Sequence, residues 1–296
     1  MIIVLLFALY VFSSGFTGNI YKKLAVESHN KSMSSFMPSV WCMMLAAVFG
    51  IASLFGDSIA LKQIPIAIGA GICILAAIVI LIESMKTNSM SISIIIMNLN
   101  FIITVALSSI FLKEKVAIIQ LIGMIASVAV ILILNLKGDE KNGKKGAVFL
   151  PLVACIANGL VNFLIKLNGV VEAGSESSST NAFNAIMYLS AAATAIIAGI
   201  IFGRKQTGKN IAGVVKKKTL PFMVLMGLCN GVCFYMAGIL AGKMNAAAQF
   251  TIVTAASIMI SLVIGMIFQK EKFTWKVAVS LVCCSVALLC QMTTLI

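Results

Sequence analysis

The sequence predicts an all-α integral membrane protein with ten transmembrane helices, arranged as two inverted repeats of five helices. Composition is the first reason: 61% of the 296 residues are hydrophobic, 10% are charged, and the mean hydropathy is +1.10. Soluble domains carry roughly a quarter charged residues, so a soluble globular fold is excluded. Two further observations are the recurrence of apolar stretches of about 20 residues, a membrane-spanning length, and a short charged turn that occurs twice.

The apolar stretches are interpreted as helices because each is long enough to cross a bilayer core of about 30 Å. A spanning segment has to be a helix or part of a closed barrel, and barrel strands alternate in polarity whereas these stretches are continuously apolar. The first stretch lacks a basic start, so we expect a retained helix rather than a signal peptide. The predicted spans are 2–20, 36–56, 64–85, 89–112, 116–136, 147–167, 182–203, 220–241, 246–268 and 273–294.

The repeated turn divides the chain into two similar halves. Residues 111–115, Phe-Leu-Lys-Glu-Lys, return at residues 268–272 as Phe-Gln-Lys-Glu-Lys, about 157 residues later. Because each half has an odd number of spans, the second half enters the membrane from the opposite side and the two are inverted. Other landmarks recur in the same order: Ser14-Gly15 with Asn158-Gly159, and Pro65 with Pro221. We predict a first repeat in residues 1–136, a linker in 137–146 and a second repeat in 147–296.

The net charge of +13 comes from lysines in the connections between spans, where they fix topology and touch lipid phosphates. We therefore expect no nucleic-acid partner. The eight cysteines lie inside predicted spans without a CxxC pair, and there is one histidine, so we expect no metal site and no cofactor. Most lysines fall on one side of the ten-span arrangement, which by the positive-inside rule places both termini outside. Five lysines fall on the other side: Lys62, Lys113, Lys115, Lys166 and Lys243.

The end of each half resembles a known family. Glu114 at a short turn is followed by Gln120, Gly123 and a small-residue-rich apolar segment, and the second copy keeps Glu271 without the Gln and the Gly. This order is similar to that of the drug/metabolite transporter superfamily, in its ten-span EamA-like branch. The resemblance implies the two-repeat fold, a transport function and both termini in the cytoplasm. The last point conflicts with the lysine distribution, so orientation stays open.

Polar residues inside the spans are the candidates for a functional site, because they are costly in a membrane. Asn100, Thr104 and Ser108 recur every four residues and so share one helical face. The resemblance implies that the third, fourth, eighth and ninth spans wall a central cavity. The alternative is that such residues only bond neighbouring helices together. The predicted cavity residues are Tyr10, Asn98, Asn100, Thr104, Asn158, Asn230, Tyr235, Gln249 and Thr254, with Ser14 and Asn162 beside them.

The charged residues near the spans are predicted to have structural roles. Glu83 pairs with Lys86 near a helix end, and Lys166 extends to the membrane interface like its repeat partner Lys22. Glu114 and Glu271 brace the turns that they occupy, at the positive end of the helix that follows. The middle of the first span has no acid, in contrast to small multidrug exporters of the superfamily. A neutral or zwitterionic metabolite is therefore the expected cargo.

These observations predict a secondary transporter that moves small metabolites, amino-acid-like or other polar solutes, by alternating access, with export as the expected direction. Alternatives are a multidrug exporter or a lipid flippase of the same fold. A membrane-embedded lipid-modifying enzyme would need clustered acids, histidines or a nucleophile, which His29 in a polar loop does not supply, so no enzyme is expected. The predicted location is the plasma membrane (bacterial inner membrane), multi-pass, with a small-molecule substrate and membrane lipid as partners. Coupling to protons or a counter-substrate, and a monomer or a homodimer, stay open.

Overall fold

The computed structural model describes residues 8–15, 17, 60–87, 96–135, 149–173, 179–204, 220–268 and 275–292. Within these ranges the secondary structure is helical and contains no strand, which confirms the predicted all-α class. The predicted span 36–56, the linker and Glu271 lie outside the described residues, so the total of ten helices stays a prediction. The helices are α3 (Gln63–Thr87), α5 (Asn100–Phe111), α6 (Ile118–Asn135), α7 (Phe149–Ala173), α8 (Thr180–Arg204), α9 (Leu220–Ala241), α10 (Ala246–Phe268) and α11 (Trp275–Met292), and residues 8–15 form a further helical segment.

Every helix falls on a predicted span, and four stretches of the described chain are long and apolar enough to cross a membrane. The predicted end of the sixth span at residue 167 is wrong, because α7 continues to Ala173. Lys166 marks no helix end: it lies inside α7 and is buried. The four spanning stretches are Gln63–Ser84, Phe149–Glu172, Thr180–Ala198 and Val224–Ala241.

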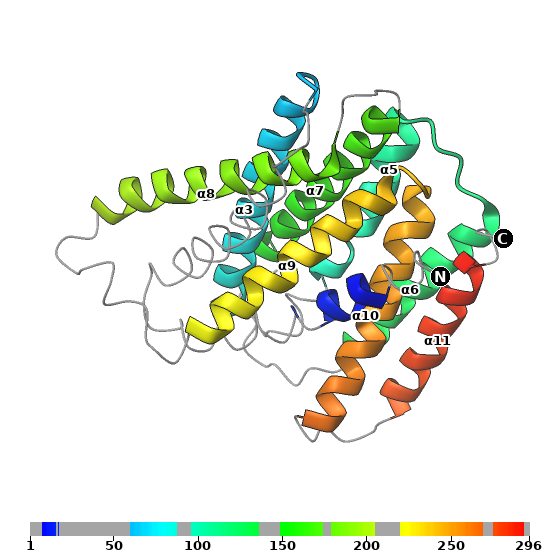
Figure 1. The fold of residues 1–296 in the computed structure, drawn as a ribbon. Coiled ribbons are helices and arrows are strands. Elements are labelled where there is room, and N and C mark those ends of the chain that lie inside the picture. The colour runs from blue at the N-terminus through cyan, green and yellow to red at the C-terminus, as the bar shows by residue number, and fades with distance from the viewer. Residues whose placement is uncertain are drawn as a thin grey trace.

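The helices pack as a bundle in which α3 lies along α7 and α8, while α7 also contacts α5 and α9 (Figure 1). On the other side of the bundle α6 packs against α11, and α10 contacts α5, α6 and α11. The interior of the first group is filled by apolar residues of α3, α7, α8 and α9, with fully buried Met187 and Met226 among them. Because lipid removes the hydrophobic drive between membrane helices, close packing of this kind has to hold them together.

Two glycines show the same close helix contact in both halves. A Cβ on Gly15 would lie 3.3 Å from Ser257 O and 2.8 Å from Ile260 Cγ2, and a Cβ on Gly159 would lie 3.0 Å from Asn100 O and 2.9 Å from Ile103 Cγ2. Ser257 and Ile260 follow Asn100 and Ile103 by the spacing of the two charged turns. This agreement supports the predicted duplication.

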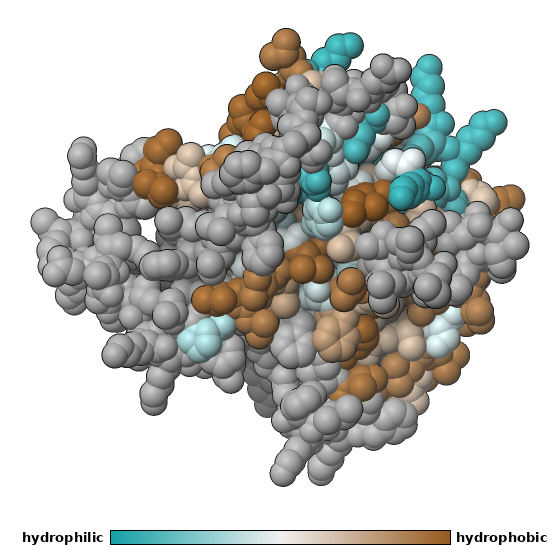
Figure 2. Space-filling model, viewed as in Figure 1, coloured by the Kyte–Doolittle hydropathy of each residue, from teal (hydrophilic) through white to brown (hydrophobic). Residues whose placement is uncertain are grey.

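One end of the bundle gathers several connections. Gln63 Nε2 donates to Asn168 Oδ1 at 2.8 Å, and Gln120 Nε2 donates to Asn245 Oδ1 at 3.2 Å, so the starts of α3 and α6 meet α7 and the α9–α10 connection. In Figure 2 hydrophilic residues gather at this end, toward the upper right of the view, with some hydrophobic residues beside them and more over the flanks below. The ten-span arrangement places the same connections on one side of the membrane. The exposed lysines at this end are Lys62, Lys113, Lys115 and Lys243.

The α3–α8 contact gives a test of this packing. Gly71→Ala is expected to lower the free energy of unfolding by about 1–3 kcal/mol, the usual cost of overpacking. A Cβ on Gly71 would lie 1.9 Å from Ser190 Oγ and 2.3 Å from Met187 O. Thermal unfolding in detergent measures the change.

Gly231→Ala is the matched control, because nothing lies within 4 Å of a Cβ at that helical position. Alanine's helix propensity predicts unchanged or slightly higher stability, by up to about 1 kcal/mol. Equal melting temperatures for the two variants would contradict the close approach of α3 and α8.

Candidate functional site

A cavity of about 150 Å³ lies between the N-terminal helical segment, α3, α5, α7, α9 and α10. Helices from both halves of the sequence contribute to its wall. Tyr188 of α8 supports this wall from behind, because its hydroxyl donates to the backbone oxygen of Asn230 at 3.2 Å. The lining residues are Tyr10, Ser14, Thr17, Ile74, Ile78, Leu81, Met97, Asn98, Asn100, Asn158, Asn162, Asn230, Cys233, Phe234, Phe250, Val253, Thr254 and Ser257.

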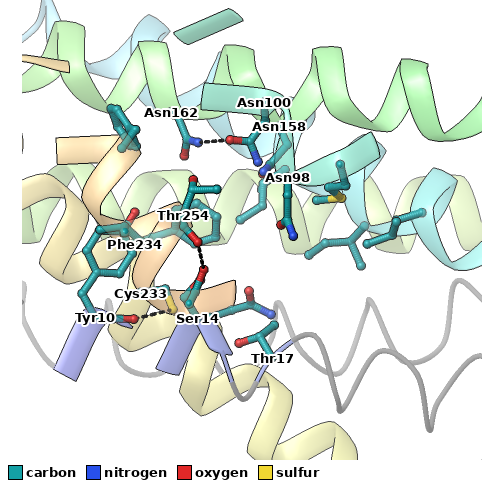
Figure 3. A pocket seen from close by; sticks show the side chains of 18 residues that line it. Tyr10, Ser14, Thr17, Asn98, Asn100, Asn158, Asn162, Cys233, Phe234 and Thr254 are labelled. Atoms are coloured by element: carbon teal, nitrogen blue, oxygen red, sulfur yellow. Dashed lines mark hydrogen bonds between the residues drawn. The ribbon is translucent and has the colours of Figure 1, made fainter. Parts of the chain in front are cut away.

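Four asparagines form one side of the cavity (Figure 3): Asn98 and Asn100 at the start of α5, and Asn158 and Asn162 on α7. Asn162 Nδ2 donates to Asn100 Oδ1 at 3.3 Å, which joins the two helices across the cavity wall. Each carboxamide can both donate and accept hydrogen bonds. We call this set the amide cluster.

Figure 3 shows Ser14 and Thr17 apart from these four asparagines, with Thr254 between the two groups. Thr17 Oγ1 donates to Ser13 O at 2.7 Å, and Ser257 Oγ donates to Thr254 O at 3.0 Å. Their protons are therefore engaged with backbone, which leaves oxygen lone pairs available as acceptors. An apolar wall of Ile74, Ile78 and Leu81 from α3, with Phe234 from α9, completes the cavity.

The cavity wall carries no formal charge: among the described residues that line it, none is Asp, Glu, Lys, Arg or His. Bringing an ion into an apolar interior costs several kcal/mol unless a partner charge compensates it. Hydrogen-bonding groups without countercharges suit a guest that is polar and carries no net charge.

Most of the predicted site residues meet at this cavity. Thr104 and Gln249 do not line it: Thr104 Oγ1 lies 3.1 Å from both Asn100 O and Gly159 O, and Gln249 Nε2 donates to Ala237 O at 2.8 Å. Tyr235, half-buried on α9, is also absent from the lining, while its neighbour Phe234 is present. The predicted residues that do line the cavity are Tyr10, Asn98, Asn100, Asn158, Asn230 and Thr254.

Several lining residues were not predicted, among them the apolar side chains of α3 and Phe234. The duplication is the signal that finds them: with Pro65 and Pro221 aligned, Ile74 corresponds to Asn230 and Ile78 to Phe234. Both members of each pair line the cavity. A cavity between two repeats is lined by equivalent positions of both. Each polar candidate in one half therefore identifies the equivalent position in the other half as a further lining residue, whether that residue is polar or apolar.

Lys166 corrects a sequence prediction. Its side chain is 4% exposed and does not extend to the membrane interface. Lys166 Nζ lies 2.9 Å from Glu114 Oε1 and donates to Ala241 O at 2.6 Å and to Met244 O. The three protons of the ammonium thus meet three oxygens, as a buried lysine requires.

The role of Glu114 also differs from the prediction. Glu114 was expected to brace the start of the helix that follows it, α6, but it braces the start of α10. Glu114 Oε2 accepts the backbone N–H of Ala246 at 2.8 Å, at the first residue of α10. A carboxylate at a helix N-terminus satisfies a free N–H and complements the helix dipole. Lys113 takes the left-handed conformation, with φ of 55°, and the Glu114 N–H returns to Ser108 O at 3.4 Å, which ends α5 and directs the carboxylate to α10.

The fold is a multi-span helical membrane fold, as the four spanning stretches and the family match below indicate. A solved structure described as "Crystal structure of protein" aligns with 97% of this chain and 96% of its own, with a TM-score of 0.72 and 13% identity, which is a likeness of fold. No curated protein matches the chain. Residues 1–136 match the sequence model of the EamA-like transporter family, which confirms the resemblance to the drug/metabolite transporter superfamily. Members of this family are membrane transporters of the drug/metabolite type.

The position of Thr104 gives a test of its role. Thr104→Val keeps the side-chain volume and removes the hydroxyl that bonds α5 to α7. The free energy of unfolding is expected to fall by about 0.5–1.5 kcal/mol, with little change at the cavity, because Thr104 does not line it. Thermal unfolding and ligand binding are both measured. A large loss of binding without loss of stability would indicate that Thr104 contacts the ligand.

Proposed function

We propose that the protein is a secondary transporter that moves small polar metabolites without net charge, amino acids or similar solutes, by alternating access through this cavity. The observation that carries the proposal is the uncharged, hydrogen-bonding wall made by helices of both halves. The coarser conclusion, a membrane transporter of the drug/metabolite type, comes from the family match. We further propose a multi-pass location in the plasma membrane, with export as the direction that the resemblance favours.

The size of the cavity favours a metabolite over a bulky drug. Pockets for drug-sized ligands measure about 300–1,000 Å³, whereas this cavity measures about 150 Å³. A bulky organic cation would also need a carboxylate to offset its desolvation. An amino acid carries two opposite charges close together, and the amide cluster offers donors to its carboxylate and acceptors to its ammonium.

Alternating access requires two parts that move against each other around the site. The proposed parts are the two five-helix repeats, residues 1–136 and 147–296. The equivalent contacts of Gly15 and Gly159, and the equivalent lining positions of α3 and α9, support this division. An inverted pair of this kind opens a midplane site to one face and then to the other.

Flux through purified protein in liposomes tests the function. The panel should contain zwitterionic amino acids, neutral polar solutes, carboxylates, organic cations and a fluorescent lipid, each with and without a pH gradient. Flux confined to the zwitterionic and neutral solutes is expected. Preference for organic cations would favour a multidrug exporter, lipid movement would favour a flippase, and no flux of any compound would overturn the transporter.

Asn100→Ala tests the site. Asn100 contributes a carboxamide to the cavity and holds Asn162 in place, so its loss is expected to weaken substrate binding. One lost hydrogen bond costs about 0.5–1.5 kcal/mol, or up to about tenfold in affinity. Initial flux at substrate concentrations below KM makes the measurement.

Ser285→Ala is the matched control, because Ser285 is exposed on α11 and donates within its own helix to Leu281 O at 2.9 Å. This variant is expected to transport like the unmodified protein. Equal flux in Asn100→Ala and Ser285→Ala, at equal insertion, would remove Asn100 from the site.

A further inference from the structure

We propose that the Glu114–Lys166 ion pair is a gate that closes the cavity at the end of the bundle formed by the α5–α6 turn and the α9–α10 connection. The inference rests on the proposed transport function, because a gate has meaning only if the cavity opens to two faces. Glu114 and Lys166 do not line the cavity, and in this proposal they decide from which face it is reached.

The pair lies directly beyond the cavity along two of its walls. On α7, Asn158, Asn162 and Lys166 recur every four residues and share one helical face, and the first two line the cavity. On α10, Ala246 is bonded by Glu114, and Phe250 and Thr254, one and two turns further, line the cavity. Along each helix, the residue at the ion pair is therefore about one turn from the nearest lining residue, a rise of about 6 Å for four residues.

A third wall leads to the same place. α5 carries Asn100 at the cavity, and Thr104 and Ser108 continue the same face toward the end of the helix. The Glu114 N–H contacts Ser108 O at 3.4 Å, so the carboxylate is anchored to the end of that helix. Three helices that line the cavity thus converge on one charge pair.

The pair also joins the two proposed moving parts. Glu114 belongs to residues 1–136, whereas Lys166 and the α9–α10 connection belong to the second half. A second bond crosses at the same level, since Gln120 Nε2 donates to Asn245 Oδ1 at 3.2 Å and Asn245 Nδ2 donates to Gln120 Oε1 at 3.4 Å. The Gln63–Asn168 bond also joins the halves at this end, so separating them here must break all three sets of contacts.

The electrostatics provide two stable arrangements. In the closed arrangement the side chain of Lys166 is 4% exposed and that of Glu114 is 18% exposed. Lys166 Nζ contacts Glu114 and two backbone oxygens. In the open arrangement both charges would lie in the entrance, where water replaces these partners. Lys113 and Lys115 beside Glu114 are already exposed, so water reaches this end of the bundle. An intermediate arrangement, in which the pair is broken but both charges are still buried, is unfavourable. The ion pair is therefore expected to be either fully formed or fully exposed to water.

Access of a cavity cysteine to thiol reagents tests the gate. Ser14→Cys places a thiol in the cavity wall with little change of volume, and peptide mass spectrometry after reaction with a membrane-impermeant maleimide reads that residue alone. The reagent is added to one face of the liposomes at a time. Lys115→Cys, exposed in the α5–α6 turn, identifies the face that carries the gate.

Glu114→Gln combined with Lys166→Met is the decisive variant. It removes both charges together, so no charge is left buried without a partner, and the glutamine oxygen still accepts the Ala246 N–H. Modification of the introduced cavity thiol from the gate face is expected to accelerate by about tenfold, since the lost interaction exists only in the closed state. Glu114→Asp, one methylene shorter, weakens the pair without removing a charge and should give a smaller acceleration.

Lys115→Gln is the matched control, because it removes a neighbouring exposed charge and should leave the rate unchanged. Unchanged rates in both gate variants, with insertion and melting like the parent, would overturn the gate. The labelling requires no substrate, so it is read separately from flux. Absence of flux would overturn the transport function, whereas unchanged labelling in a protein that transports would overturn the gate alone.

Discussion

The buried ammonium of Lys166 constrains how the helices meet at the end of the bundle formed by the α5–α6 turn and the α9–α10 connection. A lysine inside a membrane helix needs a counter-charge and hydrogen-bond acceptors, and here Glu114, Ala241 O and Met244 O supply them. Together with Lys166 itself, these groups come from three segments far apart in the sequence. Removing one partner of such a pair costs about 3–5 kcal/mol, so α5, α7 and the α9–α10 connection are held in one arrangement. The same carboxylate caps α10 at Ala246, which fixes where that helix begins.

The spans were predictable because length and continuous apolarity are enough to define a membrane helix. The face that each helix presents to its neighbours was not predictable, because a membrane span is apolar on all faces and its sequence shows little periodicity. Gln249 and Thr254 illustrate this: both are polar residues of α10, yet Gln249 bonds to α9 at Ala237 O and Thr254 lines the cavity. The prediction for Lys166 was wrong for another reason. Its partner Glu114 lies 52 residues away in the sequence, and no local sequence pattern indicates such a pair.

The predicted duplication accounts for the position of the cavity, and the differences between the two halves account for its chemistry. Equivalent positions line it from both sides, but Ser14 corresponds to Asn158, and Asn100 to Ser257. Four of the five lining carboxamides therefore lie on α7 and at the start of α5, with Asn230 on α9, while the hydroxyls of Ser14, Thr17, Thr254 and Ser257 lie on the N-terminal segment and α10. A symmetric wall would bind a solute equally well in two orientations. An amide-rich side facing a hydroxyl-rich side instead favours one orientation of an asymmetric guest, as a zwitterion would require.

The cavity and the ion pair share α5, α7 and α10, and in the proposed gate these helices couple the two. A guest that draws Asn158 and Asn162 toward itself pulls on the same face of α7 that carries Lys166 one turn further along. A ligand shifts an equilibrium only if it binds the two states differently, and the amide cluster makes that difference available, because Asn162 is bonded to Asn100 of the other half. A solute that replaces this bond with its own removes one link between the halves. In the proposed gate, the contacts that then remain to be broken are the ion pair, the Gln120–Asn245 bonds and the Gln63–Asn168 bond. A pair too strong would hold the cavity shut with solute inside, and a pair too weak would leave it open at this end without solute. Glu114 is 18% exposed and lies between the exposed Lys113 and Lys115, and partial exposure of this kind weakens an ion pair.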